Sequence, residues 1–138
     1  MHRYPVKLSL RLDWSEMDMF GHINNVSFSK YIQASRVNYW ETISLTEFHK
    51  KQNIAPMLAS TSIQFKKPLF YPGNIIVESR MDFIKNSSFS IHHRILDDKG
   101  IVAAEAQDVM VWFDFNTHRK VNFPDTLRKK VEQIESSL

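Results

Sequence analysis

The chain has 138 residues, 43% of them hydrophobic, and its 18 basic residues outnumber its 15 acidic residues to give a net charge of +3. This length suits one domain with a single core, so we interpret residues 1–138 as one domain. The absence of cysteine from the sequence excludes disulfide bonds, a thiol nucleophile and zinc–thiolate sites, while the small positive charge permits an anionic ligand without requiring nucleic acid.

Periodicity predicts the first elements along the chain. Residues 6–13 alternate polar and apolar side chains, which predicts a strand with one apolar face. Residues 28–41 predict a long helix whose apolar stripe leaves little of its surface polar, so we expect other elements to wrap it. Its side chains at helical spacing are Phe28, Tyr31, Ile32, Ser35, Tyr39 and Ile43. Residues 45–52 predict a short helix capped near Ser44, and residues 55–65 an extended segment.

The second half of the chain reads as a sheet. Residues 75–83 and 89–95 alternate in a way typical of strands with one covered face, and residues 85–88 and 97–100 predict hairpins. Residues 101–115 are long and valine-rich and predict a central strand. Residues 116–120 predict a turn, residues 121–123 a short extended piece, and the spacing of Leu127, Val131, Ile134 and Leu138 a thin amphipathic helix. One apolar helix and a one-faced sheet bury each other if the sheet curls around the helix, which predicts an α+β fold.

Reactive side chains gather just before the long helix. Asp18 places a carboxylate beside a helix start whose free N–H groups can hold a developing oxyanion, although it can equally cap a turn. Gly21 supplies an unusual backbone geometry or lets a substrate pass close to the chain. His22 positions a ligand or pairs with a loop carbonyl. Asn24 and Asn25 are good N-caps, so only the backbone of Asn25 is assigned to function.

Residues 10–28, followed by Tyr31, Ala34, Ser35 and Arg36, resemble the hotdog-fold acyl-CoA thioesterases of the 4-hydroxybenzoyl-CoA thioesterase type. The string Asp-x-x-Gly-His-x-Asn-Asn at residues 18–25 carries most of the specificity. Residues 67–74, 85–89 and 116–124 also resemble that family, so the match covers most of the chain. The resemblance implies a hotdog fold, in which a curved antiparallel sheet wraps one long central helix. It also implies a homodimer, with a homotetramer as a further option, whose sheets join edge to edge and whose active sites lie at the interface.

By similarity, Asp18 is the catalytic carboxylate, acting as general base or nucleophile, and the backbone N–H near Asn25 polarises the thioester carbonyl. Gly21 and His22 complete the candidate catalytic set, and Glu16 is secondary. The form of the motif resembles members that hydrolyse fatty acyl-CoA to free acid and CoA. The hairpin at residues 85–88 matches the turn that meets the CoA phosphates in relatives. The candidate substrate-binding residues are Lys85, Asn86, Ser87, Ser88, Ser60 and Thr61, with Lys66 and Lys67 next.

Other assignments follow from chemistry and composition. A thiol leaves readily because its reference pKa is about 8.5, so we expect no cofactor and no metal, with CoA being part of the substrate. His92 and His93 are neighbours that point to opposite faces of a strand, so they cannot chelate one ion. No window approaches ~18 apolar residues and no signal peptide is evident, so we expect a cytoplasmic protein without membrane insertion or nucleic-acid binding.

Two other functions remain open from the sequence. Hotdog domains also serve as non-catalytic modules that bind acyl-CoA or acyl carrier protein, and some hydrate or dehydrate the acyl group of a thioester. The carrier of the acyl group, CoA or acyl carrier protein, also stays open.

Overall fold

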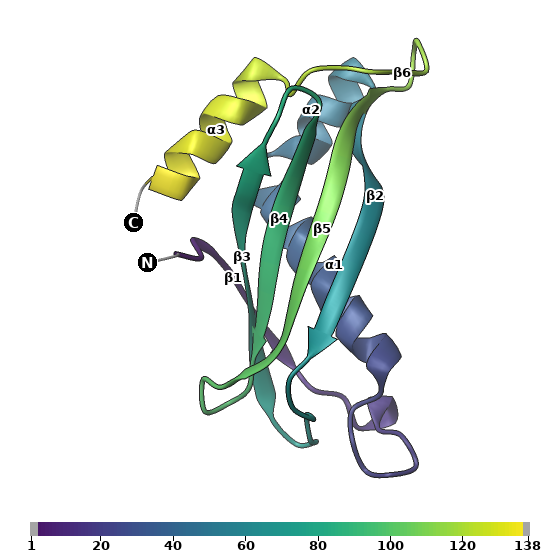
Figure 1. Ribbon diagram of the computed structural model, residues 1–138, viewed down its shortest axis with the longest axis vertical. Coiled ribbons are helices and arrows are strands. Elements are labelled where there is room, and N and C mark those ends of the chain that lie inside the picture. The colour runs from purple at the N-terminus through teal and green to yellow at the C-terminus, as the bar shows by residue number, and fades with distance from the viewer. Residues whose placement is uncertain (1–2, 137–138) are drawn as a thin grey trace.

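The computed structural model describes residues 3–136 (Figure 1). Within this range the strands form one antiparallel sheet in the spatial order β1-β3-β4-β5-β2, with β6 paired to the end of β5. The strands are β1 (Val6–Arg11), β2 (Ile54–Phe65), β3 (Asn74–Ile84), β4 (Ser88–Leu96), β5 (Val102–Asp114) and β6 (Arg119–Lys120). The helices are α1 (Asn25–Thr42), α2 (Leu45–Gln52) and α3 (Asp125–Ser136), preceded by a single 3-10 turn at Trp14–Glu16.

The sheet curls around α1, which lies along one face of it (Figure 1). Alternating residues of the strands point at the helix, and two buried apolar clusters fill the space between them. Tyr31 and Tyr39 of α1 are 6% and 0% exposed and belong to this core. The predicted hotdog arrangement is therefore confirmed. Among the described helices, none is long and apolar enough to cross a membrane.

Most predicted elements are confirmed, and their ends differ for local reasons. Strand β1 stops two residues early because the Asp13 side chain caps the 3-10 turn that follows. Helix α1 begins three residues early because the side chain of Asn24 accepts the N–H of Ser27 at 2.8 Å. Helix α2 has the predicted bounds, but Ser44 makes no side-chain capping bond.

Two expectations about the sheet and α1 need correction. The last strand pairing lies at Arg119–Lys120, within the predicted turn, and residues 121–123 form no strand although two of their N–H groups donate to carbonyls. Strand β5 pairs with β4 on one side and with β2 on the other, so the prediction of a central strand at residues 101–115 is confirmed. Within one chain α1 is covered on one side only, and Val26 and Val37 remain 70% and 44% exposed.

The C-terminal helix α3 packs beside β3, beyond the point where β1 stops pairing with that strand. Leu127 and Val131 of α3 are buried in the apolar cluster that also contains Tyr39 and Trp112, which confirms two positions of the predicted apolar stripe. Leu138 lies outside the described residues. The pairing of β1 with β3 ends at Ser79, and the carboxylate of Glu135 accepts the N–H of Met81 at 3.0 Å. Helix α3 thus supplies a partner for a backbone group beyond the end of the β1 ladder.

Candidate functional site

The loop before α1 is a tight turn that closes on itself. The N–H of Asp18 donates to the carbonyl of His22 at 2.6 Å, and the N–H of Gly21 donates to the carbonyl of Asp18 at 3.1 Å. Gly21 has φ +83, and a Cβ there would meet nothing within 4 Å. The backbone conformation, not a close approach of the protein, therefore explains the glycine.

The carboxylate of Asp18 has one oxygen engaged and one open. Its Oδ1 accepts the N–H groups of Phe20 at 2.9 Å and His22 at 3.1 Å. Its Oδ2 contacts no donor in the part of the chain that the structure describes. The turn-capping interpretation of Asp18 is therefore correct, and it leaves the second oxygen available for chemistry.

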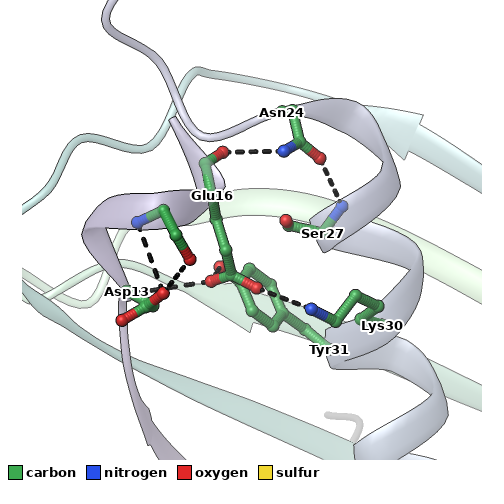
Figure 2. A network of polar contacts seen from close by, with 7 residues as sticks. Asp13, Glu16, Asn24, Ser27, Lys30 and Tyr31 are labelled. Carbon is green, nitrogen blue, oxygen red and sulfur yellow. Dashed lines mark hydrogen bonds and ion pairs between the residues drawn. The ribbon is translucent and has the colours of Figure 1, made fainter. Parts of the chain in front are cut away.

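A polar network fixes the start of α1 relative to this loop (Figure 2). The side chain of Asn24 donates to the carbonyl of Glu16 at 2.8 Å while it caps the helix. The Glu16 carboxylate accepts from Tyr31 Oη at 2.7 Å and from Lys30 Nζ at 3.1 Å. Burial opposes the ionisation of Glu16, but the bonds from Tyr31 and Lys30 outweigh it and lower its pKa. Glu16 therefore serves as an anchor for the helix.

Loop and helix start face a common open pocket of about 310 Å³. Its lining residues are Asp18, His22, Ile23, Asn25, Phe28, Phe65, Lys66, Lys67 and Pro68. The backbone N–H of Asn25 stands at the first turn of α1, where no intrahelical acceptor exists, and no other acceptor for it lies within residues 3–136. The pocket thus combines an open carboxylate oxygen with an open N–H group at the positive end of a helix.

His22 lines this pocket without a fixed polar partner. Its ring meets the ring of Phe70 edge-on, with centroids 5.0 Å apart, and it makes no side-chain hydrogen bond within the described chain. The pairing with a loop carbonyl is therefore not seen. The ring nitrogens are available to a ligand in the pocket.

The predicted substrate-binding residues lie elsewhere in the same chain. Lys85, Asn86, Ser87 and Ser88 occupy the β3–β4 hairpin, at the opposite end of the sheet from the start of α1 (Figure 1). Ser60 and Thr61 lie on the edge strand β2, away from the pocket lining. Lys66 and Lys67 do line the pocket, and each is ion-paired, with Glu105 at 3.6 Å and with Asp97 at 2.5 Å.

Sequence reasoning missed a polar network around a buried carboxylate, which joins the core to the exposed edge strand β2. Asp108 of β5 is 0% exposed and accepts from Arg36 Nε at 2.8 Å and from Thr61 Oγ1 at 2.7 Å. His93 lies between Asp108, at 2.8 Å, and Ser35 Oγ, at 2.9 Å. Burial works against ionisation, yet these bonds together lower the pKa of Asp108 to about 2. An acidic residue at an inward position of a predicted strand was the available signal.

The hydrogen bonds from Ser35 to His93 and from His93 to Asp108 resemble those of a Ser-His-Asp catalytic triad. Ser35 is 1% exposed and sits within α1, so no thioester carbonyl reaches its hydroxyl in this fold. His92 lies on the other face of β4, against Tyr4 Oη at 2.8 Å, which confirms that the two histidines diverge. The network is therefore a part of the core, and the open pocket is the candidate active site.

Comparison with known proteins agrees with this fold. The long-chain acyl-CoA thioesterase FadM of Escherichia coli is 23% identical over 86% of this chain and 90% of the relative. The chloroplastic acyl-acyl carrier protein thioesterase ATL3 of Arabidopsis thaliana is 27% identical over 92% of this chain and 66% of the relative.

Solved structures agree as well. A Thermus thermophilus thioesterase complexed with coenzyme A and zinc superposes with a TM-score of 0.85 at 22% identity, covering 100% of this chain and 99% of the other. A DHNA-CoA thioesterase from Staphylococcus aureus gives 0.81 at 16% identity, over 95% and 91%. The model of the thioesterase-like superfamily matches residues 12–131. The chain therefore belongs to the thioesterase-like superfamily and adopts its hotdog fold.

Proposed function

We propose that this protein hydrolyses acyl-CoA thioesters to a free acid and CoA in the pocket beside Asp18. One observation carries the proposal: the open Oδ2 of Asp18 and the open N–H of Asn25 belong to residues of one pocket. A carboxylate on one side of a carbonyl and an N–H donor at its oxygen form a minimal apparatus for acyl transfer.

The chemistry assigns a role to each group. The N–H of Asn25, helped by the partial positive charge of the α1 N-terminus, holds the oxygen of the thioester as it becomes negative. Asp18 Oδ2 either attacks the carbonyl carbon, forming an acyl-aspartate anhydride that water then hydrolyses, or takes a proton from a water molecule that attacks the carbon directly. The sulfur leaves as a thiolate, and CoA-SH needs little acid assistance because its pKa is near that of a free thiol, about 8.5.

Fatty acyl groups are the proposed substrates, and CoA the proposed carrier. The inner wall of the pocket is apolar, where the rings of Phe28 and Phe65 meet with centroids 5.2 Å apart. FadM, a relative, is named for long-chain acyl-CoA, whereas ATL3 is named for acyl-acyl carrier protein. Lys66 and Lys67 at the same pocket supply positive charge for the carrier phosphates.

A homodimer completes this site in our proposal. Residues 57–62 of the edge strand β2 are all exposed, with Leu58 45% and Met57 47% accessible, and such an edge invites pairing with a second copy. Exposed apolar side chains also surround the site loop; they are Trp14, Met19, Phe20, Val26, Phe65 and Phe70. A partner joined at β2 would cover part of this surface and would bring its own hairpin, residues 85–88, as a source of CoA contacts.

The test is thiol release from a panel of acyl-CoA thioesters by wild type, Asp18→Asn and Asp114→Asn. Asp114 is a matched control because its Oδ1 also accepts a backbone N–H two residues on, at 2.8 Å, in the distant β5–β6 turn. Asp18→Asn should lower kcat by about 100-fold or more while the fold and the dimer persist. Normal turnover by this variant would refute the role of Asp18. If the protein hydrolyses acyl-acyl carrier protein but not acyl-CoA, the carrier is acyl carrier protein and not CoA.

A further inference from the structure

One end of the molecule carries the excess positive charge of the chain. The end of α2, the β3–β4 hairpin, the β5–β6 turn and the start of α3 meet there (Figure 1), and we call residues 49–53, 85–88, 114–120 and 125–132 the basic end. It contains three acidic residues, Asp114, Asp125 and Glu132, and eight basic residues, which are Lys50, Lys51, Lys85, Arg119, Lys120, Arg128, Lys129 and Lys130. Even when Glu41 and Glu47 of the neighbouring α1–α2 junction are added to it, the rest of the chain has no positive excess. The net charge of +3 therefore belongs to this end.

Hydrogen bonds hold the four segments of the basic end together. The carbonyl of Gln52 accepts from Asn116 Nδ2 at 3.1 Å, which joins α2 to the β5–β6 turn. The carbonyl of Asn86 accepts the N–H of Phe123, just before α3, at 2.9 Å. Lys130 Nζ donates to a carbonyl at the α1–α2 junction at 3.4 Å. The segments therefore keep fixed positions relative to one another.

Most charges of the basic end have no acidic partner within residues 3–136. Of its eight basic side chains only Arg128 makes an ion pair there, with Glu132 at 3.3 Å, and the other seven belong to exposed residues. By contrast, carboxylates elsewhere pair with four lysines, which are Lys7, Lys30, Lys66 and Lys67. Uncompensated positive charge is thus concentrated at one end, where it attracts anionic partners.

The composition of the basic end suits a lipid surface better than a protein. Six of its eight basic residues are lysine, a residue that is depleted at the centre of protein–protein interfaces, where arginine and aromatic residues are enriched. An anionic bilayer attracts lysine side chains without requiring a matching shape. Phe115, whose N–H donates to the carbonyl of Asn53 at 3.0 Å, is 37% exposed beside the end of α2. Its ring offers an apolar group to the headgroup region of a membrane.

We propose that the basic end binds the surface of membranes that contain anionic phospholipids. The contact is with the surface alone, and the active-site pocket stays clear of it because the pocket lies at the other end of α1 (Figure 1). This binding goes beyond the proposed function, since it needs no thioester. With fatty acyl substrates, it would also bring the enzyme to a surface that takes up the free acid product.

The test is co-sedimentation of the full chain with vesicles, one set made of equal parts of phosphatidylglycerol and phosphatidylcholine and one of phosphatidylcholine alone. The wild type should bind only the anionic vesicles, and raising the salt concentration about tenfold should release it. Each basic residue near the lipid contributes about fivefold to such binding. Lys50→Gln combined with Lys51→Gln, and Arg119→Gln combined with Lys120→Gln, should therefore each weaken it by about tenfold or more.

Arg11→Gln combined with Lys99→Gln is the matched control. Both residues are exposed, neither makes an ion pair within residues 3–136, and the variant loses the same charge. They lie at the other end of the sheet, one length of β4 away from the basic end, or ~30 Å for nine residues. This exceeds the Debye length of about 10 Å at 0.1 M salt, so vesicle binding should change less than about twofold.

Three outcomes would overturn the proposal. Either the wild type does not sediment with anionic vesicles, or the control loses as much binding as the basic-end variants, which would make net charge the cause. A higher KM for acyl-acyl carrier protein in the basic-end variants, with vesicle binding intact, would assign the surface to an acidic protein instead. Because vesicle binding is measured without substrate, failure of the wild type to hydrolyse acyl-CoA would refute the proposed function alone.

Discussion

The acid stability of the protein should depend on the buried carboxylate of Asp108. Its pKa is about 2 in the folded chain against an ordinary value of 3.8, so the unfolded chain takes up this proton first as the pH falls. The stabilisation is complete above the unfolded pKa and disappears as the pH drops through the folded pKa. The gap between 3.8 and about 2 is equivalent to about 2 kcal/mol of unfolding free energy, and roughly half of it is lost by pH 3.

The measurement is urea unfolding of wild type and Asp108→Asn at pH 6 and pH 3. The variant should be less stable by about 3 kcal/mol at pH 6, because Arg36 loses its buried partner. This difference should shrink by about 1 kcal/mol at pH 3, where the unfolded wild type binds the proton that the variant lacks. Asp97→Asn is the control for a paired carboxylate nearer the surface: its bond to Lys67 also lowers its pKa to about 2. Lys67 and Asp97 are 34% and 10% exposed against 17% and 0% for Arg36 and Asp108, so added salt should screen the contribution of Asp97 more.

One result would refute this reasoning. If the difference in unfolding free energy between wild type and Asp108→Asn is the same at both pH values, folding does not lower the pKa of Asp108. The network of Arg36, His93 and Thr61 would then not be the source of acid sensitivity.

Three further changes have defined outcomes. Glu135→Gln weakens the bonds to Tyr39 Oη, at 2.6 Å, and to the Met81 N–H, and should cost about 1 to 2 kcal/mol in urea unfolding; no change would mean that α3 is held by apolar contacts alone. Asn24→Ala removes the N-cap of α1 and should cost about 1 kcal/mol while lowering kcat, whereas an unaltered kcat would separate the cap from the site. Gly21→Ala forces φ +83 on a residue with Cβ and should cost about 1 kcal/mol by thermal unfolding; equal stability would show that the loop adapts.

Local patterns predicted most of the elements. The alternation in residues 75–83 and 89–95 reports which face of β3 and β4 is buried, because a strand has a period of two. The capping preference of Asn24 and the apolar stripe after it located α1 to within three residues. The errors concern residues 116–123, where a two-residue pairing depends on the end of β5 and carries no period of its own.

One part of the candidate site could be predicted from residues close together in the sequence, and another part could not. The short string from Asp18 to Asn25 forms one loop and one helix start, so local hydrogen bonds bring its members together. The hairpin at residues 85–88 was grouped with this string by resemblance, yet it stands at the other end of the same sheet (Figure 1). Only the pairing of strands reveals that distance.

The sequence by itself determined the helix and strand periods, the reactive loop and the family resemblance, because each depends on residues close together in the chain. The tertiary structure alone decided the partners of Asp108. Arg36, Thr61 and His93 come from three separate elements, and their bonds to one buried carboxylate form only when α1, β2 and β4 pack around β5. A buried charge needs such partners because water is excluded from it, and no local pattern states which distant residues will supply them.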